Sequence, residues 1–119
     1  MIIQAAKPRE KVFYPNIQNN LELPESDRFG FVLTIPNRAR ILKIIDNEID
    51  GEEIKQEINT DKYLKVHVKK LVNAPEIQDG NIKRKMKVDD LFLYSALDEI
   101  YTQVLNEINQ FRGSVDIKK

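Results

Sequence analysis

Residues 29–35 read Phe-Gly-Phe-Val-Leu-Thr-Ile, and this stretch has the clearest strand pattern in the chain. Its apolar residues alternate with a period of two, so that one face of a strand would hold Phe29, Phe31, Leu33 and Ile35. Pro36 follows and ends the strand, because proline has no backbone N–H to give to a sheet. We expect a short β element at about residues 29–35.

The residues after this strand favour a helix. Asn37 is a good N-cap, since its side chain can accept from backbone N–H groups of the first turn. The apolar side would consist of Ile41, Leu42, Ile44, Ile45 and Ile49. Gly51 stands where a helix stop is expected, which predicts a helix at about residues 38–49.

Residues 60–72 fit two structures. A helix capped by Thr60 or Asp61 is favoured, because apolar residues continue at helical spacing as far as Val72. A strand is the alternative, since Leu64, Val66 and Val68 alternate with Lys65, His67 and Lys69. Pro75 stops either element, and the turn signal at residues 79–81 is consistent with a second β element near 76–86.

The last part of the chain predicts a helix at about residues 89–111. Ser95 can cap its longer segment, and Asp98 and Glu99 suit the positive end of the helix dipole. One wide apolar stripe consists of Leu97, Ile100, Tyr101, Val104, Leu105, Ile108 and Phe111. Gly113 follows as the expected stop.

Residues 1–28 favour an extended N-terminal arm, because Pro8, Pro15 and Pro24 restrict the backbone and asparagines favour turns. The predicted organisation is this arm, a single globular domain at residues 29–112 and a flexible tail at 113–119. The predicted fold class is α+β and predominantly helical, with three helices and one short β element.

Composition excludes several classes of protein. The 119 residues contain no cysteine, which removes disulfides, thiolate metal sites and cysteine nucleophiles. Nineteen basic residues balance nineteen acidic ones, which argues against a general nucleic-acid binder. No apolar run approaches the roughly 20 residues that span a bilayer, and no nucleotide-binding or hydrolase motif is present. We expect no membrane contact, no enzyme activity and no cofactor.

Residues 46–57 match part of a calcium loop. Asp46, Asp50 and Glu57 fall at three ligand positions of the EF-hand pattern, with Gly51 at its glycine position. Glu48 is longer than the usual third ligand, and no second loop exists to pair with this one. The alternative is an acidic connection exposed to solvent.

A basic cluster consists of Lys83, Arg84, Lys85 and Lys87. On a strand the three lysines would project together, as phosphate contacts require. No aromatic residue is interleaved, so base stacking is unsupported. The alternative function is a small nucleic-acid-binding or regulatory protein that uses this cluster. The single histidine, His67, has no evident nucleophile and is expected at the surface.

The order of these segments resembles small proteins encoded among the head and tail morphogenesis genes of bacteriophages and prophages. The resemblance rests on residues 7–14, an acidic segment at 21–25, the aromatic strand at 28–33, residues 68–72 followed by 79–83, and a helix start at 88–91. It implies a tail-assembly factor, such as a chaperone, or a minor structural protein, with other phage proteins as partners.

The resemblance and the apolar arm together predict a non-enzymatic protein that binds other morphogenesis proteins. Location in the host cytoplasm or the virion follows, and a homo-oligomer is also compatible. The expected contact residues are Val12, Phe13, Tyr14, Leu21 and Leu23 in the arm, and Tyr101, Leu105 and Ile108 in the final helix.

Overall fold

The computed structural model describes residues 1–3, 9–50 and 53–117, without the side chains of 45–50, 53–58 and 114–117. Its strands and α-helices are β1 (Glu10–Phe13), β2 (Gly30–Thr34), α1 (Arg38–Leu42), β3 (Ile45–Asp50), β4 (Glu53–Ile58), α2 (Thr60–His67), β5 (Val68–Val72), β6 (Glu76–Asp79), β7 (Ile82–Lys85), α3 (Asp90–Leu93) and α4 (Asp98–Ile117). Short 3-10 helices occupy Asn20–Glu22, Glu25–Asp27 and Ser95–Leu97.

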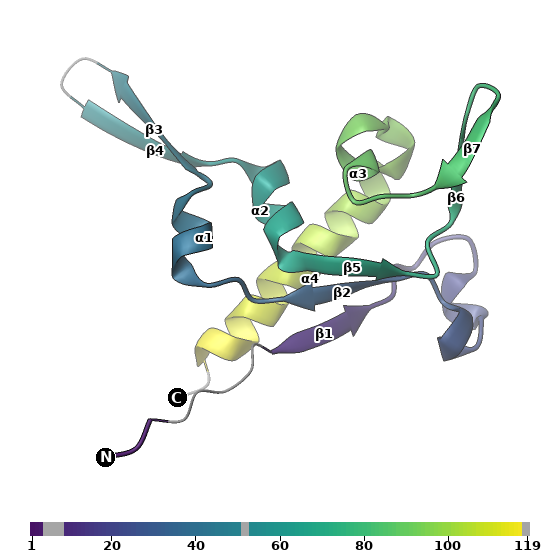
Figure 1. Cartoon of the computed structure of the whole chain (residues 1–119), viewed down its shortest axis with the longest axis horizontal. Helices are drawn as coiled ribbons and strands as arrows, with labels where there is room; N and C mark the ends of the chain where they lie inside the picture. Colours follow the sequence, from purple (N-terminus) through teal and green to yellow (C-terminus); the bar gives the residue numbers. More distant parts are fainter. Residues whose placement is uncertain (4–8, 51–52, 118–119) are drawn as a thin grey trace.

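A three-stranded antiparallel sheet in the order β1-β2-β5 lies at the centre of the fold (Figure 1). The central strand pairs Phe31 with Phe13 of β1 and with Leu71 of β5. The strand at 29–35 can hold this place because its residues are apolar on both faces, as a strand buried between two neighbours requires.

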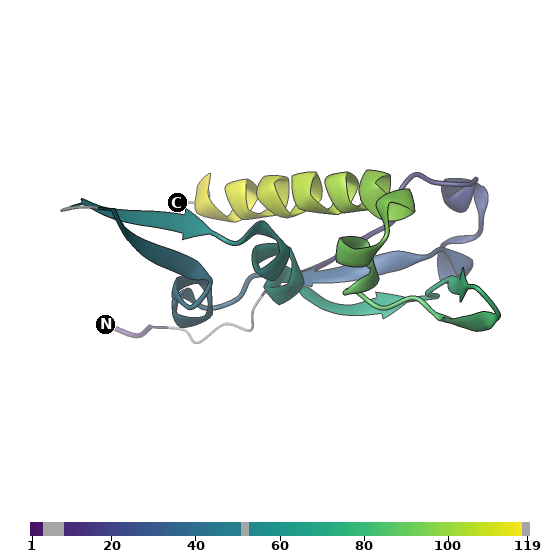
Figure 2. The same ribbon diagram turned by 90° about the horizontal axis from the view of Figure 1, so that it is seen from above.

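Helix α4 runs along one face of this sheet and closes the core (Figure 2). Its apolar stripe meets the alternating residues of β2 and one residue of α2. The fully buried side chains at this contact are Phe31, Leu33, Leu64, Val104 and Ile108. Burying each large side chain stabilises the fold by about 1.5–3 kcal/mol.

A buried asparagine fastens the connection between β1 and β2. The Nδ2 group of Asn20 donates to the carbonyl oxygens of Pro15, at 3.0 Å, and Phe29, at 2.9 Å. Its Oδ1 atom accepts from the backbone N–H of Phe29 at 2.9 Å. The Asn20 side chain thus satisfies backbone groups of Pro15 and Phe29, which lie just beyond the last paired residues of β1 and β2.

Two hairpins stand away from this core, β3–β4 at one end and β6–β7 at the other (Figure 1). The radius of gyration is 17.2 Å, whereas a compact domain of this length has about 13.5 Å. The chain is a plate with extents of 50 × 46 × 19 Å. The projecting hairpins account for this shape.

The α+β class is correct, but the prediction of a predominantly helical chain with one short β element is wrong. The described residues contain seven strands in three antiparallel sheets. The strand predicted at 29–35 is β2, and the second β element considered near 76–86 is the β6–β7 hairpin.

The helix predicted at 38–49 is wrong beyond its first turns, because α1 ends at Leu42 and β3 follows. Ile45 and Ile49 are four residues apart, a spacing that fits one face of a helix and equally one face of a strand. In the structure they pair with Ile58 and Ile54 across the hairpin. Residues 38–49, on which the helix prediction was based, do not include the strand partners Ile54 and Ile58. Gly51, the predicted stop, lies outside the described residues.

Both readings of residues 60–72 are partly right, since α2 ends at His67 and β5 starts at Val68. The helix predicted at 89–111 is divided into α3, a 3-10 turn and α4. Helix α4 also continues through Gly113 to Ile117, where the sequence predicted a stop.

The predicted extended arm is not separate from the domain. Residues 10–13 form β1 and pair with β2, and Asn20 is buried between the two strands. The prolines do restrict this segment, but the neighbouring strand supplies the hydrogen bonds that a linker would leave to water.

Candidate interaction surfaces

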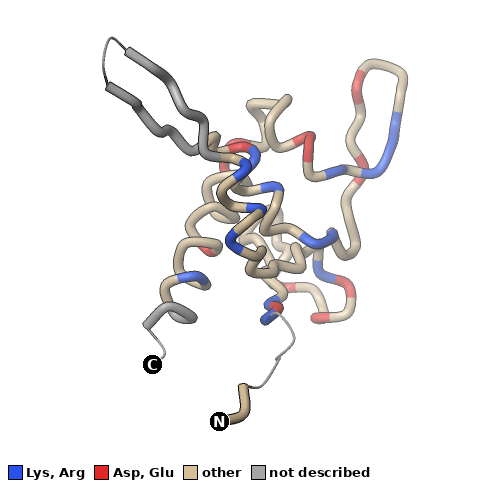
Figure 3. Tube along the Cα trace, turned by 60° about the vertical axis from the view of Figure 1, so that its left-hand side comes forward, with Lys and Arg blue, Asp and Glu red and all other residues tan. Residues whose placement is uncertain are grey.

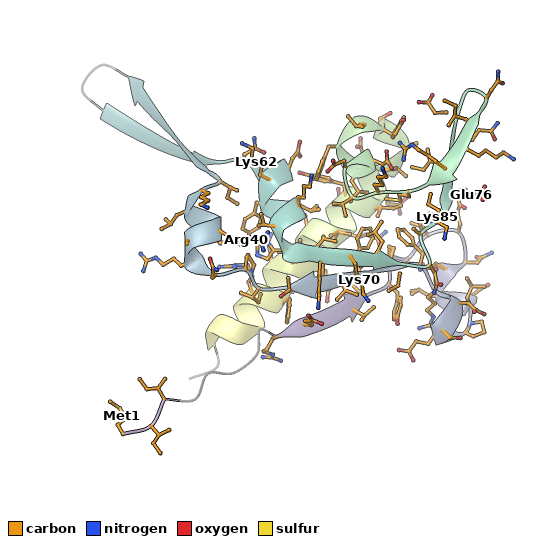
Figure 4. All side chains as sticks on the ribbon, viewed as in Figure 1. Met1, Arg40, Lys62, Lys70, Glu76 and Lys85 are labelled. Atoms are coloured by element: carbon orange, nitrogen blue, oxygen red, sulfur yellow. The ribbon has the colours of Figure 1, made fainter. Side chains whose placement is uncertain are left out.

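Basic residues gather along α1, α2 and β5 (Figure 3). We call this surface the basic belt, and it consists of Arg38, Arg40, Lys43, Lys62, Lys65, Lys69 and Lys70, all of them exposed. Figure 4 labels one member on each element, Arg40, Lys62 and Lys70. The helix caps of α1 and α2 help to position these residues. The Asn37 side chain caps α1 by accepting from the Arg40 N–H at 2.9 Å, and Asn59 caps α2 by accepting from Lys62 at 3.2 Å.

Two members of the belt form ion pairs with exposed carboxylates. Lys65 pairs with Asp89 at 2.8 Å, and Lys69 pairs with Glu10 at 2.7 Å. Exposed pairs of this kind contribute little, about 0–1 kcal/mol each. Within residues 1–3, 9–44 and 59–113 no salt bridge involves the other five members, and their side chains are exposed.

The structure divides the predicted basic cluster at residues 83–87. Lys83, Lys85 and Lys87 are exposed, but Arg84 turns toward Asp90. The Arg84 guanidinium donates from Nη2 to Oδ1 of Asp90 at 2.5 Å and from Nη1 to Oδ2 at 2.8 Å. The Lys87 backbone N–H also donates to Oδ2, at 2.7 Å. Arg84 therefore anchors the β6–β7 hairpin to α3.

This ion pair shifts both ionisations toward the charged forms. The Arg84 hydrogen bonds hold the pKa of the Asp90 carboxyl below its usual range, although burial opposes the shift. The hydrogen bond to Asp90 likewise raises the pKa of Arg84. A guanidinium committed in this way is not available to a phosphate, which leaves three lysines of the predicted nucleic-acid cluster.

His67 is fully buried between α2 and α4, and not at the surface as the sequence predicted. Nδ1 lies 2.7 Å from the Tyr63 carbonyl oxygen and must donate to it. Nε2 lies 3.1 Å from Nη1 of Arg112, which donates to it. Burial, with Arg112 and Arg40 nearby, lowers the imidazole pKa despite the Tyr63 hydrogen bond. Both ring nitrogens are used, so His67 cannot serve as a general base.

The candidate calcium loop takes a different backbone from the one an EF-hand requires. Asp46, Glu48 and Asp50 lie on β3 and Glu57 lies on β4, in a hairpin that pairs Asp46 with Glu57. Helices α1 and α2 lie on either side, but the candidate loop positions themselves are extended along two paired strands, whereas an EF-hand loop wraps its ligands around one ion. The side chains of all four residues lie outside the described ones. No group of three metal-ligating residues occurs among the side chains that are described.

The predicted contact residues divide by exposure. Val12, Leu21 and Leu23 are exposed, whereas Phe13, Tyr101 and Leu105 are half-buried against the core and Tyr14 is half-buried beside Gly30 and Arg28. Ile108 is fully buried and belongs to the core, so it is not a contact residue.

The Tyr101 hydroxyl donates to Oδ1 of Asp61 at 3.0 Å, and burial together with this bond raises the pKa of Tyr101 to about 12.

A groove of about 490 Å³ lies beside the start of α4. Its polar lining residues are Asn16, Gln18, Asn19, Glu76 and Glu99. Ile17, Ile77, Met86, Leu97 and Ile100 line it with apolar groups. The two charged residues of this lining are both acidic, in contrast to the basic belt.

The basic belt is not among the surfaces predicted from the sequence. Its signal was present, since residues 28–43 contain four basic and no acidic residues and residues 62–70 contain four basic ones. The β3–β4 hairpin, which is rich in acidic residues, lies between these two stretches in the sequence. The net charge of each half of the chain therefore does not show the two basic stretches. Only the contact of α1 with α2 brings them together.

Comparison of this chain with known protein families, with characterised proteins and with solved structures finds no match. Among the described helices, none has both the length and the apolar character needed to cross a membrane. A proposal for the function therefore has to rest on the surfaces of the chain itself.

Proposed function

We propose that this chain is a non-enzymatic protein of a bacteriophage or prophage that binds other morphogenesis proteins, as a tail-assembly factor or a minor structural subunit. It would act in the host cytoplasm or in the virion. The observation that carries the proposal is the plate-like shape with two hairpins that stand clear of the core (Figure 1).

Both hairpins project from the core (Figure 1), although Arg84 and Ile77 tie the body of the β6–β7 hairpin to α3 and to the core. A two-stranded hairpin alone is marginally stable in water, and it gains stability when it packs on something else. The β6–β7 hairpin also exposes Ile82 by 65% at the start of β7, and Leu93 on the neighbouring α3 is 69% exposed. Apolar groups on a projecting element are suited to burial against a partner.

The engagement of His67 supports a non-enzymatic role. General-base chemistry needs a ring nitrogen that can reach a substrate. Both nitrogens of His67 are hydrogen bonded inside the core, and the ring has no exposed surface. The histidine thus has a complete structural explanation.

The test is pairwise co-expression of the full chain with the product of each adjacent gene, followed by purification on a tag of the full chain. We expect at least one of these products to co-purify, and Ile82→Ser to weaken its capture. Asn81→Ser, in the turn directly before Ile82, is the control and should leave capture unchanged. Failure of every adjacent product to co-purify with the wild-type chain contradicts the proposal.

Point substitutions, and not a deletion, are needed to test whether residues 9–28 contact a partner. Deleting residues 1–20 removes β1 and Asn20, so the loss of binding would only report unfolding. Val12→Ser and Leu23→Ser change exposed residues and keep the sheet. Weaker capture by either variant extends the contact surface to this segment.

Nucleic-acid binding is the second candidate, and the basic belt is the observation that favours it (Figure 3). A polyanion on this surface would displace counterions, so the affinity would fall steeply with salt. Gel-shift titrations with single- and double-stranded DNA and RNA at low and high salt test this candidate. No binding at low salt removes it.

A further inference from the structure

We propose that the outer edge of β5 pairs with β3 of a second copy of this chain, so that the sheet continues from one copy into the next. The inference rests on the proposed function, in which the projecting hairpins bind proteins, and it names one partner for the β3–β4 hairpin.

The first observation is the open edge. In the order β1-β2-β5, strand β5 pairs with β2 on one side, and no strand of the described chain pairs with its other side. Strand β3 likewise pairs only with β4 among the described strands. An unpaired strand edge offers a row of backbone N–H and C=O groups to another strand.

The second observation is the charge along β5. This strand reads Val-Lys-Lys-Leu-Val, and Lys69 and Lys70 are both exposed. Lysines on an edge strand repel basic strands and resist pairing with apolar ones, because a buried ammonium group lacks a partner. An acidic strand removes this penalty, so the same lysines select for it.

The third observation is that this chain contains such a strand. Strand β3 reads Ile-Asp-Asn-Glu-Ile-Asp, with three acidic residues and no basic one. Its six residues match the five of β5 in length. Residues 45–58 together hold six acidic residues and one basic residue, so the rest of this neutral chain has a net charge of +5. The chain carries both halves of a charge-complementary contact.

Within one copy β3 and β5 are in different sheets, and α2 lies between the hairpin and β5. The hairpin leads into the start of α2 at Thr60, and β5 leaves the other end of α2 at Val68 (Figure 1). Eight residues of helix separate the two strands by about 12 Å along its axis. The hairpin also points away from the sheet, so β3 reaches a β5 edge only on another copy.

The acidic hairpin also favours a second copy over nucleic acid as the occupant. It joins α1 to α2, so its negative charge adjoins the basic belt from both elements. A long polyanion on the belt would meet this charge, whereas a second copy presents a limited acidic strand. Because β5 and β3 are different surfaces, repetition of the contact gives rings or filaments when it is not reciprocal.

The test uses full-length variants and light scattering behind size exclusion, at several concentrations and two salt levels. The wild-type chain should self-associate, and high salt should weaken the association. Lys69→Glu with Lys70→Glu should weaken it about tenfold or more, and so should Asp46→Lys with Glu48→Lys. Lys83→Glu with Lys85→Glu makes the same charge change on β7 and is the matched control, which should still assemble.

Mixing the two interface variants decides the pairing. One variant has two acidic surfaces and the other has two basic ones, so their mixture restores both contacts and should assemble. A melting curve on each variant checks that it is folded. A monomeric wild type, no rescue on mixing of folded variants, or assembly that a nuclease disperses would overturn the inference.

Failure of this pairing is distinguishable from failure of the proposed function. If adjacent gene products still co-purify with a chain that stays monomeric, the proposed function stands and the pairing between copies is wrong. If the chain self-associates through β3 and β5 but captures no adjacent product, the pairing stands and binding of other morphogenesis proteins is wrong.

Discussion

The ring of Tyr14 lies against the backbone of Gly30, so closely that a Cβ atom at residue 30 would stand 2.8 Å from its Cδ1 atom and 3.1 Å from the Phe13 carbonyl oxygen. The guanidinium of Arg28 stacks over the same ring, with 5.6 Å between Cζ and the ring centroid. Tyr14 is thereby fixed on the face of the sheet opposite to α4.

Gly30→Ala should therefore destabilise the fold. The added methyl group must displace a ring held by Arg28 or a strand carbonyl, which costs about 1–3 kcal/mol of unfolding free energy. Gly113→Ala is the matched control, because a Cβ there meets nothing within 4 Å and alanine favours helix α4. Denaturant melts of both variants measure the difference, and equal stabilities would contradict the contact.

Asn20→Asp should destabilise the chain in a pH-dependent way. The carboxylate would face the carbonyl oxygens of Pro15 and Phe29, to which Asn20 now donates. We expect a loss of at least about 2 kcal/mol at neutral pH. The loss should shrink in acid, where a protonated carboxyl group can donate one bond again. Thermal melts at pH 7 and pH 4 relative to wild type check this, and a constant difference would argue against the bonding pattern.

Arg84→Met should release the β6–β7 hairpin and destabilise the chain. It leaves the buried Asp90 carboxylate with the Lys87 N–H alone, and an uncompensated buried charge is costly. Since pairing lowers the pKa of Asp90 in the folded state, its contribution to stability is present above the ordinary carboxyl pKa and is lost as the pH falls through the folded value.

The melting temperature of Arg84→Met should therefore lie several degrees below that of wild type at pH 7, and the gap should narrow in strong acid. Lys85→Met, on the same strand with an exposed side chain, is the control and should melt close to wild type. Similar melting of the two variants would show that the ion pair does not hold the hairpin.

His67 should make the fold less stable in mild acid. Its lowered pKa means that the folded chain favours the neutral ring, so the stabilisation is complete above the ordinary value of about 6.5. It falls as the pH drops below that value toward the folded pKa, where the added proton on Nε2 faces Arg112. His67→Gln does not titrate, so its melting temperature should change less between pH 7.5 and 5.5. An identical change in both proteins would contradict the buried neutral ring.

Features that depend on neighbours along the chain were predictable from the sequence. The apolar alternation of β2 and the wide stripe of α4 are strong local patterns, and both elements are present near the expected residues. The N-cap at Asn37 and the turn at Gly80 were also predictable from the sequence, because a cap or a turn involves only a few consecutive residues. These signals identified an α+β chain.

The failures occurred where two structures satisfy one local pattern. Residues 45–49 fit a helix, and only pairing with residues 54–58 makes them a strand. Residues 10–13 resemble an arm until β2 supplies a partner. His67 and Arg84 looked exposed in the sequence, but the packing of α4 and α3 commits both to internal contacts.

The sequence by itself determined the central strand, the covering helix and the total charge of zero, because these follow from composition and from spacing along the chain. Only the tertiary structure decided which strands pair, which polar groups are buried and where charge accumulates. Strand pairing and burial depend on residues far apart in sequence, and the basic belt exists because α1 and α2 meet in space although an acidic hairpin separates them along the chain.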